Sequence, residues 1–367
     1  MSGLYIHIPF CKKACNYCNF HFTVSQKSKT EFIKAIVKEI HDKRNYLGND
    51  ELETIYFGGG TPSTLEIKEL ELIFESINEN FKIAENAEIT IETNPDDLDL
   101  EKLTEYKKLG INRLSIGVQS FNNKDLEFTA RVHSSTDAIE SIKNAQKVGF
   151  KNITIDLIYG IPDSDKDRWE NNLNKIIALD IPHFSAYALT VEPKTILEYQ
   201  IRKGVQKDVD EELVREQYFQ LVEFAKSNNF IHYEISNFGK NDFFSIHNSN
   251  YWKSKKYLGV GPSAHSYDLK SRQWNTNNNT EYIKKINSKE KYFETEILDS
   301  ADKFNEYLML SLRTIWGVDL DKLFSISNNF NREKFDNKIE YFQNMDFIFR
   351  EGNKIKLTDE GTLFSDG

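Results

Sequence analysis

All three cysteines of this 367-residue chain lie within eight residues near its start, in YIHIPFCKKACNYCNF (5–20). They are Cys11, Cys15 and Cys18, spaced C-x3-C-x2-C. Three thiols cannot all pair as disulfides within one chain, whereas thiolates are the ligands that iron–sulfur clusters and zinc prefer. The spacing therefore predicts a metal centre on one loop. His21 leaves a Cys3His zinc site open as an alternative, and three buried, unliganded cysteines are a second alternative.

A run of glycines in YFGGGTP (56–62) is the second chemical signal. Consecutive glycines let the backbone come close to a ligand, because no side chain stands in the way. A tight turn explains many such runs. Here the run directly follows a predicted strand, at the end of the sheet where we also expect the thiols. This position favours a backbone segment that binds a cofactor.

The composition narrows the class of protein. The formal net charge of −10 disfavours binding to nucleic acid phosphates. The hydrophobic residues, 39% of the chain, are enough to form a buried core. No apolar run approaches the roughly 20 residues of a membrane span, and no secretion signal opens the sequence. We therefore expect a cytoplasmic protein, in which clustered thiols stay reduced and serve metals or catalysis rather than disulfides.

Strands and amphipathic helices alternate over the first half of the chain, which predicts a parallel sheet. The predicted strands are 4–8, 54–59, 88–93, 113–118, 153–160 and 184–189. Helical periodicity marks 30–47, 68–81, 101–110, 137–149 and 168–180. Six right-handed units form either a partial (β/α)6 barrel or a doubly wound sheet, and in both the loops after the strands gather on one rim.

The pattern changes after residue 205, so we predict three segments: a barrel over 1–205, a connecting region over 206–299, and a C-terminal domain over 300–367. Helical patterns at 301–315, 319–324 and 332–345, followed by a hairpin over 347–361, predict a winged-helix-like domain. Such domains often read DNA. Here the third helix carries as many acids as bases, and we expect no nucleic acid partner.

Together these motifs resemble the radical S-adenosylmethionine (SAM) enzymes. The resemblance rests on C-x3-C-x2-C with an aromatic residue, Tyr17, before the last cysteine, and on Gly-Gly-Gly-Thr-Pro after the second strand. It implies a [4Fe–4S] cluster held by three cysteines. The fourth iron would bind the amino and carboxylate groups of SAM, and an electron passed to the sulfonium would release a 5′-deoxyadenosyl radical.

Within that superfamily, YIHIPFC, GGGTPS, IETNPDD, GINRLSIGVQSFN, TIDLIYGIP and YALTVEP resemble, in order, the oxygen-independent coproporphyrinogen III oxidase group. Position by position, this resemblance implies SAM contacts at Tyr5, Tyr17, Gly59, Gly60, Thr61, Glu92, Gln119, Arg131, Asp156 and Ala188. Several lie at predicted strand ends on the same rim. There, carboxylates can bind ribose hydroxyls, and an arginine can bind a carboxylate. Taken singly, each is equally compatible with a structural polar residue.

Three features separate the chain from the oxidases and resemble the HemW-type heme chaperones. Phe20 replaces a further cysteine, few residues precede the first strand, and HNSNYW (247–252) fits the His-Asn-x-x-Tyr-Trp signature. The resemblance implies heme contacts at His247, Tyr251 and Trp252. His247 is the predicted axial ligand, since neutral imidazole suits heme iron. A structural histidine is the alternative reading; His265 is a weaker ligand candidate.

The predicted function is thus a heme chaperone with a [4Fe–4S] cluster and SAM. Its partners would be heme-accepting proteins, respiratory ones at the membrane surface among them, and an electron donor such as flavodoxin or ferredoxin. The alternative is a radical SAM oxidase that decarboxylates the propionates of coproporphyrinogen III. The sequence assigns no catalytic residue, and we predict His133 to be structural.

Overall fold

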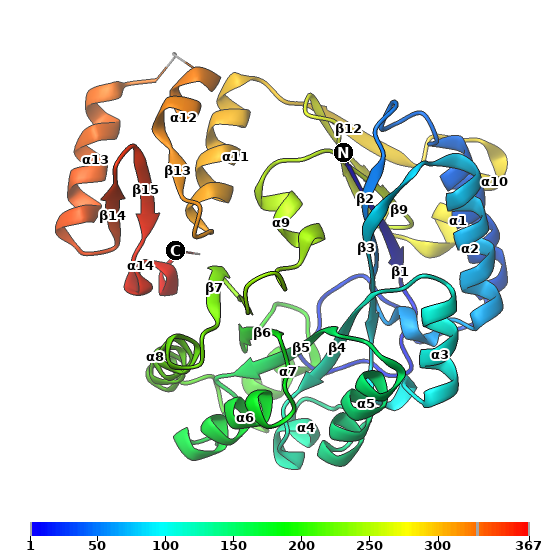
Figure 1. The fold of residues 1–367 in the computed structure, drawn as a ribbon, viewed down its shortest axis with the longest axis horizontal. Helices are drawn as coiled ribbons and strands as arrows, with labels where there is room; N and C mark the ends of the chain where they lie inside the picture. The colour runs from blue at the N-terminus through cyan, green and yellow to red at the C-terminus, as the bar shows by residue number, and fades with distance from the viewer. Residues whose placement is uncertain (1, 328–329, 366–367) are drawn as a thin grey trace.

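The computed structural model describes residues 2–327 and 330–365 of the chain. Six parallel strands form the centre of its large sheet, in sequence order. They are β1 (Ser2–Ile8), β2 (Leu52–Gly59), β3 (Ile83–Thr93), β4 (Arg113–Gln119), β5 (Asn152–Tyr159) and β6 (His183–Ala188). Their outer face is covered by helices, as Figure 1 shows. The prediction of a partial barrel is confirmed.

The covering helices lie between the strands in sequence and after β6, and the longer ones bury one apolar stripe each. They are α1 (Lys29–Asp42), α2 (Ile67–Asn80), α3 (Leu100–Lys108), α4 (Asn123–Phe128), α5 (Ser135–Val148), α6 (Lys166–Ala178), α7 (Ile196–Arg202) and α8 (Glu211–Ser227). In α1 the buried residues Phe32, Ile33, Ile36 and Ile40 repeat at the spacing of one helix face. The strands carry the other half of the same core, with Leu4, Ile6 and Ile8 all fully buried.

Residues 231–297 extend the sheet at both edges. The elements are β7 (Ile231–Glu234), β8 (Asn237–Gly239), α9 (Ile246–Trp252), β9 (Tyr257–Val260), β10 (His265–Tyr267), β11 (Ser271–Asn275), α10 (Asn279–Ser288) and β12 (Phe293–Ile297). Within the described residues the sheet order is β12-β11-β10-β9-β1-β2-β3-β4-β5-β6-β8-β7. These added strands have three to five residues, too few to show a period in the sequence.

The C-terminal part has its own small core, which includes Phe304, Leu323 and Ile355. Its elements are α11 (Ser300–Leu312), β13 (Val318–Asp319), α12 (Leu320–Ile326), α13 (Arg332–Asn344), β14 (Ile348–Glu351), β15 (Lys354–Leu357) and α14 (Asp359–Leu363). The three predicted helices and the hairpin are present, and α9 lies between this part and the barrel (Figure 1). Residues 328–329 and 366–367 of the predicted domain lie outside the described residues.

The predicted segment boundaries at 205 and 299 stay predictions, although β7 to β12 belong to the barrel's sheet. In the part of the chain that the structure describes, no helix combines the length and the apolar character needed to cross a bilayer.

Candidate cofactor site

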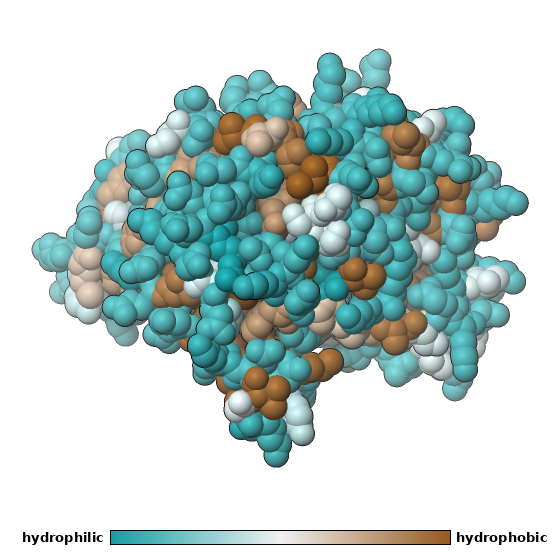
Figure 2. All heavy atoms as spheres, turned by 90° about the horizontal axis from the view of Figure 1, so that it is seen from below, coloured by the Kyte–Doolittle hydropathy of each residue, from teal (hydrophilic) through white to brown (hydrophobic). Residues whose placement is uncertain are grey.

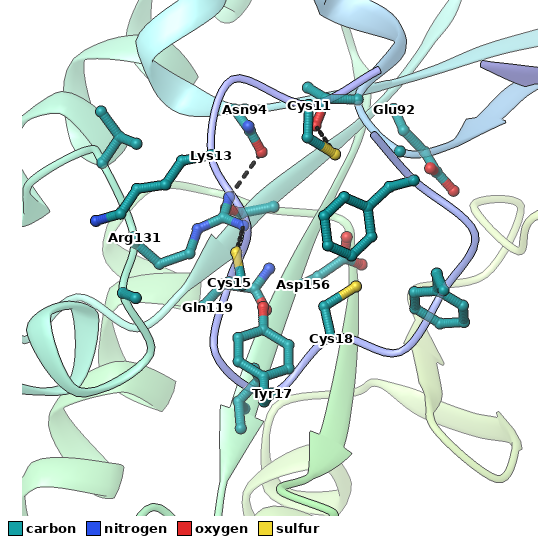
Figure 3. Close-up of a pocket in the computed structure, with 18 of the residues that line it drawn as sticks. Cys11, Lys13, Cys15, Tyr17, Cys18, Glu92, Asn94, Gln119, Arg131 and Asp156 are labelled. Carbon is teal, nitrogen blue, oxygen red and sulfur yellow. Dashed lines mark hydrogen bonds between the residues drawn. The ribbon is translucent and has the colours of Figure 1, made fainter. Parts of the chain in front are cut away.

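A pocket of about 490 Å³ lies where the central strands end. The loop that carries the cysteines forms one wall, and the ends of β2 to β6 form the others (Figure 3). Of the residues predicted to hold the cluster or SAM, those that line it are Cys11, Cys15, Tyr17, Cys18, Gly59, Gly60, Thr61, Glu92, Gln119, Arg131, Asp156 and Ala188. The fold therefore brings residues from six successive strand–loop units to one place, as parallel strands require.

The glycine run docks the cysteine loop onto the barrel. The Gly60 N–H donates to the Ile8 carbonyl at 2.7 Å, and the Thr61 N–H donates to the Phe10 carbonyl at 2.8 Å. A Cβ on Gly60 would stand 2.8 Å from the carbonyl carbon of Pro9, a contact that forces the backbone apart. Gly60 is thus needed for this close approach, and the position of Cys11 depends on it.

Each of two thiols has a hydrogen-bond donor beside it. The Thr61 hydroxyl donates to Cys11 Sγ, and Arg131 Nη1 donates to Cys15 Sγ, both at 3.4 Å (Figure 3). Burial raises the pKa of the Cys11 thiol to about 11, against the lowering effect of the Thr61 hydroxyl, and burial also raises the pKa of Cys18. Binding to a metal deprotonates a thiol outright and overrides such shifts.

The donor set fits an iron–sulfur cluster, since three thiols on one loop are ligands that such a cluster takes. A single zinc ion would take a fourth ligand. The one considered, His21, is hydrogen-bonded through Nε2 to Asn279 Oδ1 at 2.7 Å.

Two half-buried carboxyls face the pocket, Glu92 from β3 and Asp156 from β5, on either side of β4. Glu92 Oε1 accepts a hydrogen bond from the Tyr56 hydroxyl at 2.8 Å, and its Oε2 accepts one from the Gly59 N–H at 3.1 Å. Burial, with repulsion from Asp156, raises the pKa of Glu92 to about 7. Burial likewise raises the pKa of Asp156, which accepts from the Ser115 hydroxyl. Such carboxyls can accept hydrogen bonds from the hydroxyls of a sugar.

Two residues of this pocket have left-handed backbone. Gln119 ends β4 with φ 67°, and Ala130, which precedes Arg131, has φ 57°. Left-handed backbone at non-glycine residues costs on the order of 1–3 kcal/mol and persists where the surroundings fix it. Here it aims Gln119 at Tyr17, whose hydroxyl donates to Gln119 Oε1 at 3.2 Å, and Arg131 at Asn94, with Nη2 to Oδ1 at 2.7 Å.

Some residues of the pocket were missed by the sequence reasoning. Asn94 in IETNPDD and Ser115 in GINRLSIGVQSFN line the pocket, although the sequence analysis gave neither a role. Tyr187, which precedes Ala188 in β6, also lines it. His133 also lines the pocket; it is buried, and its Nε2 bonds the Val118 carbonyl at 3.0 Å, as a structural histidine would. The periodicity of the strands identifies which residues reach the rim, but not which of them turn inward.

Tyr5 is not among the described residues that line the pocket. Its hydroxyl is hydrogen-bonded to His7 Nδ1 at 3.1 Å, and its ring stacks on Tyr56 and His247. Tyr5 as a SAM contact stays a prediction.

The predicted heme motif is split between the interior and a second cavity. His247 is buried, with Nδ1 bonded to Thr54 Oγ1 at 2.7 Å and Nε2 to the Tyr251 hydroxyl at 2.9 Å. Tyr251 and Trp252 line a cavity of about 490 Å³ between the barrel and α11. His247 as an axial ligand stays a prediction, and it requires the bond to Tyr251 to open. His265 lines neither this cavity nor the thiol pocket.

The surface around the thiol pocket is not uniformly polar. Phe20, Val132 and Tyr187 line the pocket and expose 71%, 58% and 44% of their surface. Figure 2, seen from the side toward which β1 to β3 point, shows hydrophobic atoms gathered in patches within a mainly hydrophilic surface. The entrance thus offers apolar contacts to a ligand or a partner.

Comparisons with known proteins agree with this geometry. Residues 5–176 match the model of the Radical SAM superfamily. The heme chaperone HemW of Bacillus subtilis is 33% identical over 366 residues, which cover 99% of this chain and 97% of the relative. HemW of Escherichia coli is 34% identical over 267 residues, covering 72% of this chain and 69% of that protein. The mitochondrial radical S-adenosyl methionine domain-containing protein 1 of mouse is 32% identical over 72% of this chain and 60% of its own length.

Among solved structures, coproporphyrinogen III oxidase (HemN) from Escherichia coli superposes with a TM-score of 0.86 over 99% of this chain and 88% of its own. At 21% identity, this likeness concerns the fold. Fold and site together define a radical SAM protein. Within that superfamily, the chain belongs to the HemW family. Membership of the superfamily implies a [4Fe–4S] cluster and SAM.

Proposed function

We propose that this protein binds heme and passes it to acceptor proteins, and that it carries a [4Fe–4S] cluster and SAM in the thiol pocket. The observation that carries the proposal is the placement of Tyr251 and Trp252 on the wall of a second cavity, while Tyr187 lines both that cavity and the thiol pocket. A heme and a cofactor would then sit on either side of one side chain.

In the thiol pocket, Cys11, Cys15 and Cys18 would hold the cluster. The chemistry supplied by the bound cluster and SAM is one-electron cleavage of a carbon–sulfur bond. The chain's own groups orient the nucleotide: Glu92 and Asp156 accept from its hydroxyls, and the guanidinium of Arg131 attracts a carboxylate. Arg131 is already fixed by Asn94 and by the Gly117 carbonyl at 2.8 Å, so it needs little reordering to bind.

In the second cavity, Trp252 and Tyr251 would contact the porphyrin face or edge, with His247 as the candidate iron ligand. Heme-accepting respiratory proteins and a flavodoxin- or ferredoxin-type electron donor are the proposed partners. The decarboxylating oxidase is the competing function. Phe20 argues against it, since this exposed residue stands where the oxidases have a further cysteine.

The decisive experiment compares wild type with Cys15→Ala after anaerobic reconstitution with iron and sulfide. We expect about four irons and four acid-labile sulfides in wild type, near zero in the variant, and a hemin Soret band in both. A colourless zinc protein would contradict the cluster. Absence of a Soret shift would contradict the heme function, and conversion of coproporphyrinogen III in the presence of SAM and reductant would favour the oxidase.

A further inference from the structure

The second cavity has five aromatic side chains among its fourteen lining residues, beside polar and charged ones. It is formed by the ends of β6 and β7, by α9, by β9 to β11, and by α11 of the C-terminal part. The aromatic residues are Tyr187, Tyr251, Trp252, Tyr257 and Tyr267. Tyr251 and Tyr257 meet edge to face at 4.6 Å between ring centroids. A volume of about 490 Å³ lies within the roughly 300–1,000 Å³ of cavities that hold small ligands, and walls of this kind suit a flat, apolar ring system.

Two arginines interrupt these aromatic walls. Arg272 comes from β11 and Arg313 follows α11, so the barrel and the C-terminal part contribute one each. Arg272 Nε bonds Glu306 Oε1 at 2.8 Å, and its guanidinium stands 5.5 Å from the centre of the Tyr267 ring. These contacts fix the plane of the guanidinium. A guanidinium has five N–H donors in a fork, and this ion pair uses Nε.

Arg313 is held from the opposite side. Its Nη2 donates to the Ser365 carbonyl at 3.3 Å, which joins α11 to the end of the described chain. Glu234 is the carboxyl among the cavity's described lining residues; it is buried and accepts from Asn237 and the Ser236 N–H. The lining holds two arginines and one glutamate, and Glu306, which pairs with Arg272, balances the second arginine. What the two arginines offer an anionic ligand is therefore guanidinium N–H donors on the cavity wall rather than an excess of positive charge.

We infer that this cavity holds the porphyrin with its two propionate groups directed at Arg272 and Arg313. The assignment rests on the proposed heme function and adds to it the residues that recognise the carboxylates. Arginine is suited to this role because its fork matches a carboxylate with two parallel hydrogen bonds. The aromatic residues contact the macrocycle, which is flat and apolar, while the negatively charged propionates accept hydrogen bonds from the two guanidinium groups.

The location of the arginines has a consequence for release of the ligand. Since Arg313 and Leu310 belong to the C-terminal part, the cavity is complete only when this part stays docked on the barrel. The docking contacts include the hydrogen bond from the Ile315 N–H to the Tyr233 carbonyl and two ion pairs at the surface, Lys226–Asp359 and Arg215–Glu360. Exposed ion pairs contribute little to stability, so an acceptor protein that displaces the C-terminal part would separate the two propionate ligands.

The test crosses changes in the protein with changes in the ligand. Hemin and hemin dimethyl ester, which lacks the propionate charges, are titrated into wild type, Arg272→Gln, Arg313→Gln and the control Arg332→Gln. Arg332 pairs with Asp336 on the exposed face of α13 and takes no part in the cavity. We expect each cavity variant to bind hemin about 10- to 100-fold more weakly than wild type, with unchanged affinity for the diester. Arg332→Gln should bind both ligands like wild type.

Iron-free protoporphyrin IX, followed by quenching of tryptophan fluorescence, repeats the test without an iron ligand. We expect the same dependence on both arginines, and Arg272→Lys should recover part of the affinity. Hemin binding that is unchanged in both Gln variants, or a diester bound as tightly as hemin by wild type, overturns the propionate assignment and leaves the heme function in place. A wild type that binds no hemin removes the function itself.

Discussion

The two cavities meet at Tyr187 but are built in different ways. The thiol pocket takes its walls from the cysteine loop and the ends of parallel strands, and its side chains include thiols, carboxyls and an arginine fixed by hydrogen bonds. The second cavity takes its walls from the end of β6, a seven-residue helix, strands of three to five residues, and the C-terminal part. Five of its fourteen lining residues are aromatic.

Because of this difference, the geometry of each site depends on a different part of the structure. The strands of the thiol pocket are locked by the ladders of a large sheet, so its geometry depends on the main core. The second cavity depends on how α9 and α11 are anchored. Changes in those anchors should therefore weaken heme binding while SAM binding persists, and the following predictions test this in order of expected size.

The largest effect is expected at Glu88, the anchor of α9. Its two oxygens accept from the Ile246 N–H at 3.0 Å and the His247 N–H at 2.9 Å, and it lies 3.6 Å from Arg113, which is also buried. Glu88→Ala leaves that arginine without its carboxylate and two amides without acceptors. Urea denaturation should show a loss of about 3–5 kcal/mol in the free energy of unfolding.

The same variant should lose affinity for hemin more than for SAM, because α9 carries Tyr251 and Trp252. Glu85→Ala is the matched control, since Glu85 lies exposed on the same strand and should cost less than about 0.5 kcal/mol. Equal unfolding energies for the two variants would show that Glu88 does not anchor the helix.

The second prediction concerns pH, because each cavity contains one glutamate whose pKa burial raises to about 7: Glu92 in the thiol pocket and Glu234 in the second cavity. A native carboxyl of this kind keeps its proton up to about pH 7, whereas the unfolded chain releases it near pH 4.5. The native state then binds more protons across this window, and stability falls as the pH rises from about 4.5 to 7.

Glu92→Gln and Glu234→Gln should each remove part of this fall, on the order of 1–3 kcal/mol, measured by urea denaturation at a series of pH values. Because the two groups serve different cavities, the double variant should show the sum of the single effects. A pH dependence as steep in the double variant as in wild type would mean that neither glutamate is protonated in the native state.

The thiol pocket could be predicted from the sequence better than the second cavity, because it is built from the ends of parallel strands. Parallel strands must end on one rim, so a glutamate or aspartate near a strand end, such as Glu92 or Asp156, could be placed in the thiol pocket from sequence. The direction of the Tyr5 ring could not be predicted, because it depends on stacking with Tyr56 and His247.

The second cavity was predicted only through Tyr251 and Trp252. Arg272 and Arg313 lie 41 residues apart by number and on different structural units, and nothing in their local sequence indicates that they meet. Their neighbours stand on strands too short for a periodic signal, so only tertiary packing brings them together.

The smallest predicted effect tests the shared wall. Tyr187, the last residue but one of β6, exposes 44% of its surface and lines both cavities. Tyr187→Ala removes a ring that each ligand would contact from its own side, and an aromatic contact of this kind contributes roughly 0.5–1.5 kcal/mol. Affinities for SAM and for hemin, measured separately by calorimetry and by absorption, should each fall about two- to tenfold. Tyr187→Phe keeps the ring and should stay within about twofold of wild type for both. A loss confined to one ligand would show that the ring serves a single cavity, and the two sites would then have to be treated as independent.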